Sequence, residues 1–321
     1  MELSPFLIEP ILKTKPWGGR RLGEIFGREL PGSEKIGESW ELSARPADSN
    51  RIISGPFSGK SLLEAIEKNP TEFLGEKIAE KYGAKLPLLA KFIDASDHLS
   101  IQVHPDDCMA LNLRESDTGK HEAWLIVEAR PGATLILGTS RELSYEEIIE
   151  LCEQGRHNEC LNYLSVEKGD VIAVPPGTLH SIGRGIVLFE VSQNSDLTYR
   201  VDDWKRNIAG RELHRERARE IVTCGPPIQP VKREIKSLPV STIYECEHFR
   251  IQELRLTDDA AELKNSLFRS ITVLEGALDI RGGEETVRAG AGRTVFCPAC
   301  AGELNIKGSG KAIIIEPVLT V

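Results

Sequence analysis

Short apolar runs rich in β-branched residues alternate with glycines and prolines along most of the chain. Runs of this kind are typical of strands in a sandwich or barrel. The expected strands are residues 88–94, 99–104, 122–128, 133–137, 171–174, 186–192, 242–246, 249–256, 270–275, 277–281, 294–297 and 311–316. The pattern therefore predicts a mainly β protein.

Three segments follow a helical pattern instead. Ser61 and Ser144 are each followed three residues later by a glutamate and then by apolar residues at helical spacing, which is the signature of a capping box. A third, charge-rich segment ends in a partial apolar stripe. We expect helical insertions around the β core over about 60–83, 144–164 and 205–222.

A proline-rich stretch divides the chain in two. Residues 224–239 read CGPPIQPVKREIKSLP, with no clear periodicity. There is also a faint internal repeat, because GDVIAVPPGTLH before this stretch resembles GRTVFCPACAGE after it. The second copy has Cys300 and Glu303 where the first has Gly177 and His180. We expect two related β units, of which only the first keeps its histidine.

Composition and charge narrow the class of partner. The chain has 321 residues and a formal net charge of −9, from 40 basic and 49 acidic residues. Because nucleic acids reward a basic surface, this balance argues against a nucleic-acid partner. No apolar run approaches the ~20 residues that span a bilayer, so we expect no membrane association. The first residues, MELSPFLIEP, lack the features of a signal peptide.

The cysteines fit a cytoplasmic protein. There are seven of them, an odd number without a regular framework, which favours a reducing compartment over a disulfide-built scaffold. Cys297 and Cys300 form the single C-x-x-C. With no second pair nearby, we expect them to pack in a strand rather than to bind zinc or to act in redox chemistry.

Candidate chemistry begins with the stretch SIQVHPDD, which places Gln102 and His104 two positions apart in a strand. Side chains alternate across a strand, so both point to one face, beside a turn. They either face solvent or converge on a ligand. In GKHEAW the same alternation puts Lys120 and Glu122 on one face and His121 on the other.

A constrained turn orients a second histidine. GDVIAVPPGTLH fits the spacing G-x5-P-x-G-x2-H, which resembles the second signature of the cupin superfamily. The segment Pro175-Pro176-Gly177 would reverse the chain, so that His180 begins the next strand facing inward. The alternative is a histidine satisfied inside the core. The resemblance implies a cupin-type β-barrel or jelly roll over residues 1–225 and a degenerate cupin-like domain over 240–321.

Four of these side chains could surround one divalent ion. Two neutral imidazoles, a carboxylate and an amide oxygen form a borderline N/O site that suits Zn²⁺, with Mn, Fe or Co as alternatives. The proposed ligands are Gln102, His104, Glu122 and His180. Because no thiolate takes part, the site is typical of catalysis or substrate binding. Gln102 departs from cupins at large, which often have a histidine there.

At this point the resemblance becomes more specific. The stretches SIQVHPDD, GKHEAW, PPGTLHSIG and FEVSQNSDLTYRVDDW resemble the type I mannose-6-phosphate isomerases in their short prokaryotic form. So do KPWGGRRLGEIFG, IGESWELS and LLAKFIDA, and the likeness covers residues 13–210 in order. It implies zinc on the four ligands named above. It also implies a sugar-phosphate pocket lined by Lys91, Ser100, Lys120, Glu190 and Arg200.

The residues allow such roles and also plainer ones. Lys120 shares a face with the ligand Glu122, and Arg200 could hold an oxyanion with its directional fork. Each cation could equally be a solvated surface charge, and Ser100 a strand-edge hydroxyl. Glu190 lies in the apolar run VLFEV, where burial could raise its pKa toward that of a general base. Its alternative is a structural acid paired with a lysine.

The expected activity is therefore interconversion of mannose 6-phosphate and fructose 6-phosphate through a metal-stabilised cis-enediol(ate). Arg200 would stabilise the enediolate, and Glu190 would move the proton, with a zinc-bound water as its rival. Two other readings stay open. One is a cupin isomerase acting on another sugar phosphate, such as glucose 6-phosphate, and the other is a non-catalytic sugar-phosphate-binding cupin. The expected partner is a small sugar phosphate, and the chain is expected to be a monomer or homodimer.

Overall fold

Two sheets form the first β unit of the computed structural model, which describes residues 3–206, 208–226, 238–264 and 266–319. One sheet has the strand order β12 (Val171–Val174), β9 (Glu122–Ala129), β14 (Ile186–Gln193), β7 (Leu88–Ala95), β3 (Ile36–Leu42) and β2 (Ile11–Gly19). The other has the order β11 (Leu161–Ser165), β10 (Thr134–Thr139), β13 (His180–Ile182), β8 (Ile101–Val103) and β15 (Tyr199–Asp202). All these pairings are antiparallel. Apolar side chains from both sheets, such as Ile126 and Leu135, share one core cluster.

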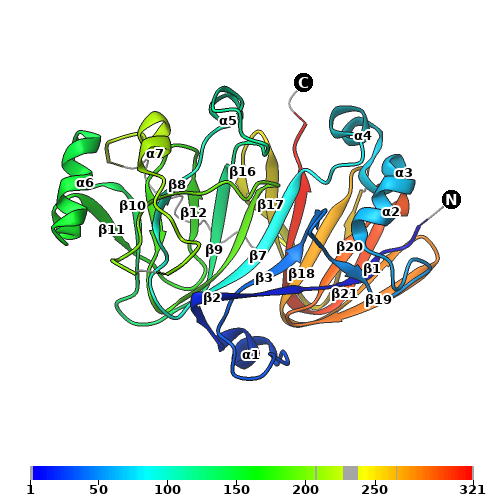
Figure 1. Cartoon of the computed structure of the whole chain (residues 1–321). Helices are drawn as coiled ribbons and strands as arrows, with labels where there is room; N and C mark the ends of the chain where they lie inside the picture. Colours follow the sequence, from blue (N-terminus) through cyan, green and yellow to red (C-terminus); the bar gives the residue numbers. More distant parts are fainter. Residues whose placement is uncertain (1–2, 207, 227–237, 265, 320–321) are drawn as a thin grey trace.

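A third sheet forms the second β unit, beside the first (Figure 1). Its order is β16 (Val240–Glu245), β17 (Phe249–Leu263), β21 (Leu304–Pro317), β18 (Arg269–Gly282), β20 (Thr294–Cys297), β1 (Phe6–Glu9) and β6 (Arg51–Ile52), with β19 (Glu285–Gly290) on β18. Register shifts interrupt the long pairings, and the one in β18 lies next to Gly276, whose φ is +73°. Such bulges bend a long strand, so one strand can curve around the core.

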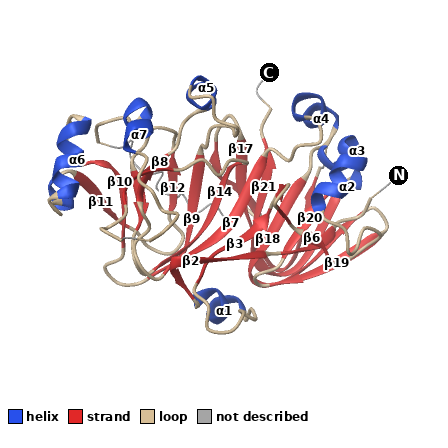
Figure 2. Cartoon of the chain, in the orientation of Figure 1, coloured by secondary structure: helices blue, strands red, loops and turns tan. Residues whose placement is uncertain are grey.

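Helices cover the outer surfaces of both units (Figure 2). The α-helices are α1 (Arg21–Phe26), α2 (Leu62–Lys68), α3 (Pro70–Leu74), α4 (Glu76–Tyr82), α5 (Asp107–Asn112), α6 (Tyr145–Glu153) and α7 (Arg215–Ile221). Two short 3-10 turns, η1 (His157–Glu159) and η2 (Ala299–Ala301), and a small ribbon of β4 (Ala44–Arg45) with β5 (Asp48–Ser49) complete the described elements. Both expected capping boxes are present, at Ser61 with Glu64 and at Ser144 with Glu147.

The two units are interlocked rather than strung one after the other. The first strand, β1, pairs with β20 of the second unit, and Phe6 stacks on Phe296 with ring centroids 5.4 Å apart. Phe73 of α3 lies against the same two rings. One apolar cluster therefore spans both units. The division into 1–225 and 240–321 stays a prediction, and most of its linker, residues 227–237, lies outside the described residues.

The mainly β fold with inserted helices is confirmed, and the differences are local. The expected strands 270–275 and 277–281 are one continuous strand, β18, because Gly276 lets the chain bulge without leaving the sheet. Residues 161–165 form a strand that pairs with β10, not the end of a helix. In the third insertion the helix is limited to Arg215–Ile221, since only these residues bring an apolar face, Ala218 and Ile221, onto the core.

Candidate functional site

Strand alternation gives one sheet of the first unit a polar inner face. On β7, β14 and β9, Lys91, Glu190 and Glu122 point into the barrel, and Glu190 is the direct cross-strand partner of Lys91. Their neighbours, such as Phe92 and Phe189, point the other way into the cluster shared with the second unit. The period of two thus separates chemistry on one face from packing on the other.

The opposite sheet supplies the histidines. His180 is the cross-strand partner of Gln102 on β8, and His104 follows the end of that strand. The turn before His180 needs its glycine, because Gly177 has a φ of +80° and a Cβ there would lie 2.8 Å from Thr223 Oγ1. The Gly177 amide donates to the carbonyl oxygen of His104 at 2.8 Å. This bond ties the two histidine-bearing segments together.

His104, Glu122 and His180 form a buried group suited to a metal ion. One ligand atom from each lies within 4.8 Å of the others. His104 Nδ1 lies 2.6 Å from the Leu197 carbonyl oxygen, and His180 Nδ1 lies 2.8 Å from the Thr178 carbonyl oxygen. This assigns the proton of each ring to Nδ1 and leaves a lone pair on each Nε2. Glu122 Oε1 is buried without a hydrogen-bond partner. Two unprotonated imidazole nitrogens near a carboxylate oxygen that has no hydrogen-bond partner form a site that fits a divalent cation.

Gln102 lies beside this group and could be a fourth ligand. Its Nε2 is 3.4 Å and 3.3 Å from the Nε2 atoms of His104 and His180, and its Oε1 accepts from Ser100 Oγ at 3.0 Å. Rotating the amide by 180° would turn its oxygen toward the histidines and let its NH₂ donate to Ser100. The two orientations differ only in which atom is called nitrogen.

A row of alternating charges continues from the metal-binding group. Lys120 pairs closely with Glu122 and lies 3.0 Å from Glu190, which in turn lies 3.3 Å from Lys91. Burial raises the pKa of Glu122 to about 7, with Glu190 adding to the effect and Lys120 opposing it. The pairing of each charge with its opposite keeps this buried row close to neutral.

The expected direction of the Glu190 pKa is wrong. Burial does raise the pKa of Glu190, but Lys120 and Lys91 outweigh it and hold this pKa at about 2. The run VLFEV shows only the apolar neighbours of Glu190 along the chain. The two lysines come from β7 and from the residues before β9, and only the fold brings them close to Glu190.

Arg200, on β15, differs from the lysines in its partners. Its Nη1 donates to the Glu212 carbonyl at 3.3 Å, and its buried Nε has no partner. Within the described residues no carboxylate forms an ion pair with it, whereas the nearby Arg211 is held by Asp203 at 2.8 and 3.0 Å. Burial lowers the pKa of Arg200, with Arg211 adding to the effect. Asp203, Glu212 and Asp196 act on Arg200 from a distance, so its guanidinium has no direct carboxylate contact among the described residues and is open to an anion.

All these groups meet in one pocket of about 170 Å³. Each residue expected from the sequence lines it, except His104, which lies behind Glu122 and Lys120. Several further polar residues line the pocket but were not predicted from the sequence: Lys15, Glu38, Asp196, Thr198 and Arg211. Lys15 and Glu38 form an ion pair at 3.2 Å. Their signal was present, because both lie in stretches that carried the family resemblance.

His121 faces away from the metal-binding group, as the alternation predicted. Its Nε2 lies 2.8 Å from the hydroxyl of Tyr244 on β16, in the second unit. Burial lowers the pKa of His121 to about 4, and His248 adds to the effect, so the ring is neutral near pH 7.

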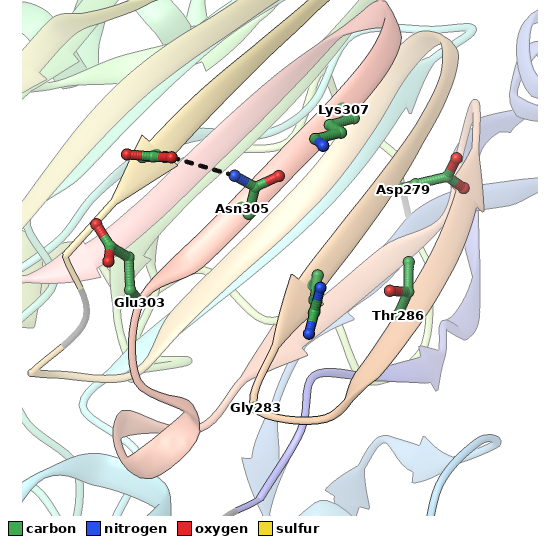
Figure 3. Close-up of a pocket in the computed structure, with 8 residues that line it drawn as sticks. Asp279, Gly283, Thr286, Glu303, Asn305 and Lys307 are labelled. Carbon is green, nitrogen blue, oxygen red and sulfur yellow. Dashed lines mark hydrogen bonds between the residues drawn. The ribbon is translucent and has the colours of Figure 1, made fainter.

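The second unit has a hollow of its own, of a different kind. It has a volume of about 400 Å³ and is lined on the outer face of the sheet by Asp279, Arg281, Glu303, Asn305 and Lys307, among others (Figure 3). The inside of this unit is a cluster of apolar side chains that includes Leu304 and Ile306, both fully buried. Glu303, the counterpart of His180 in the repeat, is exposed.

Fold and site together define a cupin-type β protein with a buried candidate metal centre. Residues 6–124 match the family model "Phosphomannose isomerase type I, catalytic domain", and residues 240–317 match "Mannose-6-phosphate isomerase, cupin domain". The chain is 34% identical over 320 residues to the probable mannose-6-phosphate isomerase GmuF of Bacillus subtilis, covering 98% of this chain and 99% of that protein. It is 32% identical, with the same coverage, to mannose-6-phosphate isomerase ManA of that organism.

A solved structure gives the same result. The crystal structure of the mannose 6-phosphate isomerase from Bacillus subtilis superimposes with a TM-score of 0.86 at 31% identity, covering 98% of this chain and 99% of that one. The chain therefore belongs to the type I phosphomannose isomerase family. The expected family and its cupin fold are confirmed. Within the described part of the chain, no helix has the length and apolarity that crossing a membrane requires.

Proposed function

We propose that this protein interconverts mannose 6-phosphate and fructose 6-phosphate with the help of one divalent cation. The observation that carries the proposal is the buried group of His104, Glu122 and His180, opening into a pocket with Lys91, Lys120 and Arg200. A sugar phosphate requires cations for its phosphate and a place for the negative charge that develops on its carbonyl oxygen. This pocket offers both in a chain that belongs to the isomerase family.

His104, Glu122 and His180 would hold the cation, with Gln102 as the fourth ligand. We propose Zn²⁺, because two imidazoles, one carboxylate and one amide oxygen form a site of borderline softness. The chemistry that such an ion supplies when bound is Lewis-acid polarisation of the sugar carbonyl. The carbonyls of Leu197 and Thr178, which accept from the two Nδ1–H groups, would fix the orientation of both rings.

The residues of the chain divide the remaining work. Isomerisation moves a proton between C2 and C1 of the open-chain sugar, while the carbonyl passes from C1 to C2 through a cis-enediol(ate). Arg200 would stabilise the negative charge on the enediolate, since no carboxylate of the described residues forms an ion pair with its guanidinium. Lys91 and Ser100 would bind the substrate, and Lys120 would face the reacting oxygens from beside Glu122.

Glu190 remains our proposed base, by a different argument from burial. Its pKa is low because Lys120 and Lys91 lie 3.0 and 3.3 Å from it. A substrate phosphate or oxyanion that attracts one of these lysines removes part of that stabilisation. The pKa of Glu190 would then rise toward neutrality when substrate binds, which is where a general base works best.

A coupled assay tests the function. Purified protein is expected to convert mannose 6-phosphate to fructose 6-phosphate, to lose this activity in a chelator and to regain it with Zn²⁺. Mannose 6-phosphate and glucose 6-phosphate are assayed side by side. Turnover of glucose 6-phosphate alone would favour the other isomerase, and binding of sugar phosphate without turnover of the metal-loaded protein would favour a non-catalytic cupin.

We further propose a cytoplasmic location and a monomer or homodimer. All seven cysteines are free thiols, which suits a reducing compartment. Cys297 lies in the apolar core of the second unit, and Cys300 packs against the apolar cluster that spans both units. Sedimentation of the purified protein measures the oligomeric state directly.

A further inference from the structure

The second β unit lies behind the catalytic sheet. Phe249, Ile251 and Ile313 of this unit share a cluster with Phe92 and Phe189, whose strand neighbours Lys91 and Glu190 face the pocket. The unit thus contacts the back of the sheet while the chemistry lies on its front. Polar contacts also join the two units: Thr294 Oγ1 donates to Glu41 Oε2 at 3.0 Å, and the Tyr244 hydroxyl lies 2.8 Å from His121 Nε2, next to the site residues Lys120 and Glu122.

His121 lies in the chain between two residues that line the pocket, Lys120 and Glu122. Those two side chains point into the pocket, and the imidazole points out of its back toward Tyr244. The rings of His248 and Phe249 lie 6.0 and 5.9 Å from the imidazole, so the second unit encloses it on several sides. A displacement of His121 would move both of its neighbours, because they share its peptide bonds.

The backbone here is the end of a loop rather than the middle of a strand, since β9 begins only at Glu122. The amide of Lys120 donates to the Pro105 carbonyl at 2.9 Å, and that of His121 donates to Gln193 Oε1 at 2.9 Å. The Gln193 amide returns a bond to the His121 carbonyl at 3.1 Å. These contacts fix the backbone from the first unit, but none of them fixes the imidazole.

We infer that Tyr244 is a positioning residue, which orients His121 and through it the site residues Lys120 and Glu122. The second unit then contributes to the active site as well as to folding. The inference rests on the proposed function for its kinetic part. Its metal-binding part needs only the ligand group, so the two can fail separately.

The test compares full-length Tyr244→Phe with the parent protein. Loss of one hydrogen bond, acting one residue away from a ligand, is expected to weaken Zn²⁺ binding by about threefold to tenfold. The turnover number of the Zn²⁺-saturated variant is expected to fall by a similar factor while KM for mannose 6-phosphate stays within about twofold. Affinity is measured with Zn²⁺ alone, by competition with a chromophoric chelator, and does not depend on turnover.

Two controls separate positioning from general stability. Ile313→Val thins the same apolar cluster between the units and changes neither ring of the hydrogen bond, and it is expected to lower the melting temperature while Zn²⁺ affinity and turnover stay unchanged. His121→Gln should weaken Zn²⁺ binding as Tyr244→Phe does, and the double variant should be no worse than His121→Gln alone, because both changes break one contact. Unchanged Zn²⁺ affinity and turnover in Tyr244→Phe, or equal effects in Ile313→Val, would overturn the inference. If the parent protein bound Zn²⁺ but did not turn over mannose 6-phosphate, only the proposed function would fail.

Discussion

The two β units use similar strand–turn–strand segments for opposite purposes. In the first, β12 leads through Pro175-Pro176-Gly177 into His180, which is buried against Glu122 and the pocket. In the second, β20 leads through η2 into Glu303, which is exposed on the outer face. Both segments end a strand and reverse the chain, and they differ in which side chains point inward.

The inward positions explain why one unit has a pocket. Lys91, Glu122 and Glu190 cannot fill the first barrel by close packing, since each requires a polar partner when it is buried. Together with Lys120 they form ion pairs, but Glu122 Oε1 is left without a hydrogen-bond partner, and room for a ligand remains. Leu304 and Ile306 fill the second barrel and leave a dry core. The same fold is thus a binding site or a support according to a few inward residues.

The strongest test of the difference between the two units changes one acid in each of them. Glu122→Gln removes the carboxylate of the candidate metal centre, and we expect at least about a thousandfold loss of turnover, since a metal supplies several kcal/mol to such reactions. Zn²⁺ content measured after dialysis should fall with it. Glu303→Gln, which changes an exposed acid at the position that His180 has in the first unit, should keep both values within about twofold. Full activity in Glu122→Gln would remove the metal centre from the mechanism.

The second-largest expected effect on kcat comes from removing the guanidinium of Arg200. Arg200→Ala is expected to lower kcat by about 100-fold to 1,000-fold, the usual effect of deleting one group that stabilises an oxyanion. The bound Zn²⁺ should stay, because Arg200 pairs with the proposed ligand Gln102 only across the strands, and among the described residues no side-chain hydrogen bond or ion pair joins it to any of the four proposed ligands. Arg281→Ala, at the hollow of the second unit, serves as the control and should leave kcat unchanged. If Arg200→Ala lost metal together with activity, its role would be structural.

Glu190→Gln tests the base and is expected to lower kcat by about 100-fold. Near-normal turnover would exclude Glu190 as the base. KM should also rise modestly, because Lys91 and Lys120 lose the partner that orients them. A matched exposed change, Glu275→Gln, breaks an ion pair with Lys168 outside the pocket and should have no kinetic effect.

The same variant predicts a pH dependence of stability. The pKa of Glu190 is about 2 in the folded protein, below its value of about 4.3 in the unfolded chain, so ionised Glu190 stabilises the fold. This contribution is fully present above the unfolded pKa and is lost as the pH falls through the folded one. The free energy of unfolding of the metal-free parent should exceed that of Glu190→Gln by about 3 kcal/mol at pH 7, and by roughly half of that near pH 3. Denaturant titrations at the two pH values measure the gap, and a constant gap would contradict the assigned pKa.

Local patterns were sufficient for most of the framework and for bringing together the candidate metal-binding group of His104, Glu122 and His180. Strand runs bounded by glycine and proline predicted β7, β9, β12 and β14 to within a residue or two. The alternation in GKHEAW correctly separated Glu122 from His121, because the period of a strand is a property of the backbone. The turn-forming residues Pro175-Pro176-Gly177 correctly predicted that His180 faces inward.

What the sequence could not provide were the long-range partners. The lysines that lower the pKa of Glu190 lie 70 and 99 positions away along the chain, and only the sheet brings them together. The same is true of β1, which crosses to the second unit to pair with β20. The ion pair of Lys15 with Glu38 at the pocket also joins positions 23 residues apart, although both residues lie in stretches that carried the family resemblance. Pairings of this kind depend on tertiary contacts that no local pattern encodes.

The smallest expected effect on turnover comes from the dry core of the second unit. Leu304→Ala creates a cavity where a fully buried side chain was, and we expect the free energy of unfolding to fall by about 2–5 kcal/mol while kcat stays within about twofold. Ile182→Ala removes a similar volume from the first unit, but there the side chain lines the pocket. That variant should lose stability and also raise KM. If Leu304→Ala lowered kcat as strongly as Ile182→Ala, the packing of the second core would have to reach the pocket through more than the Tyr244 contact, and the contrast between a reactive barrel and a supporting one would no longer hold.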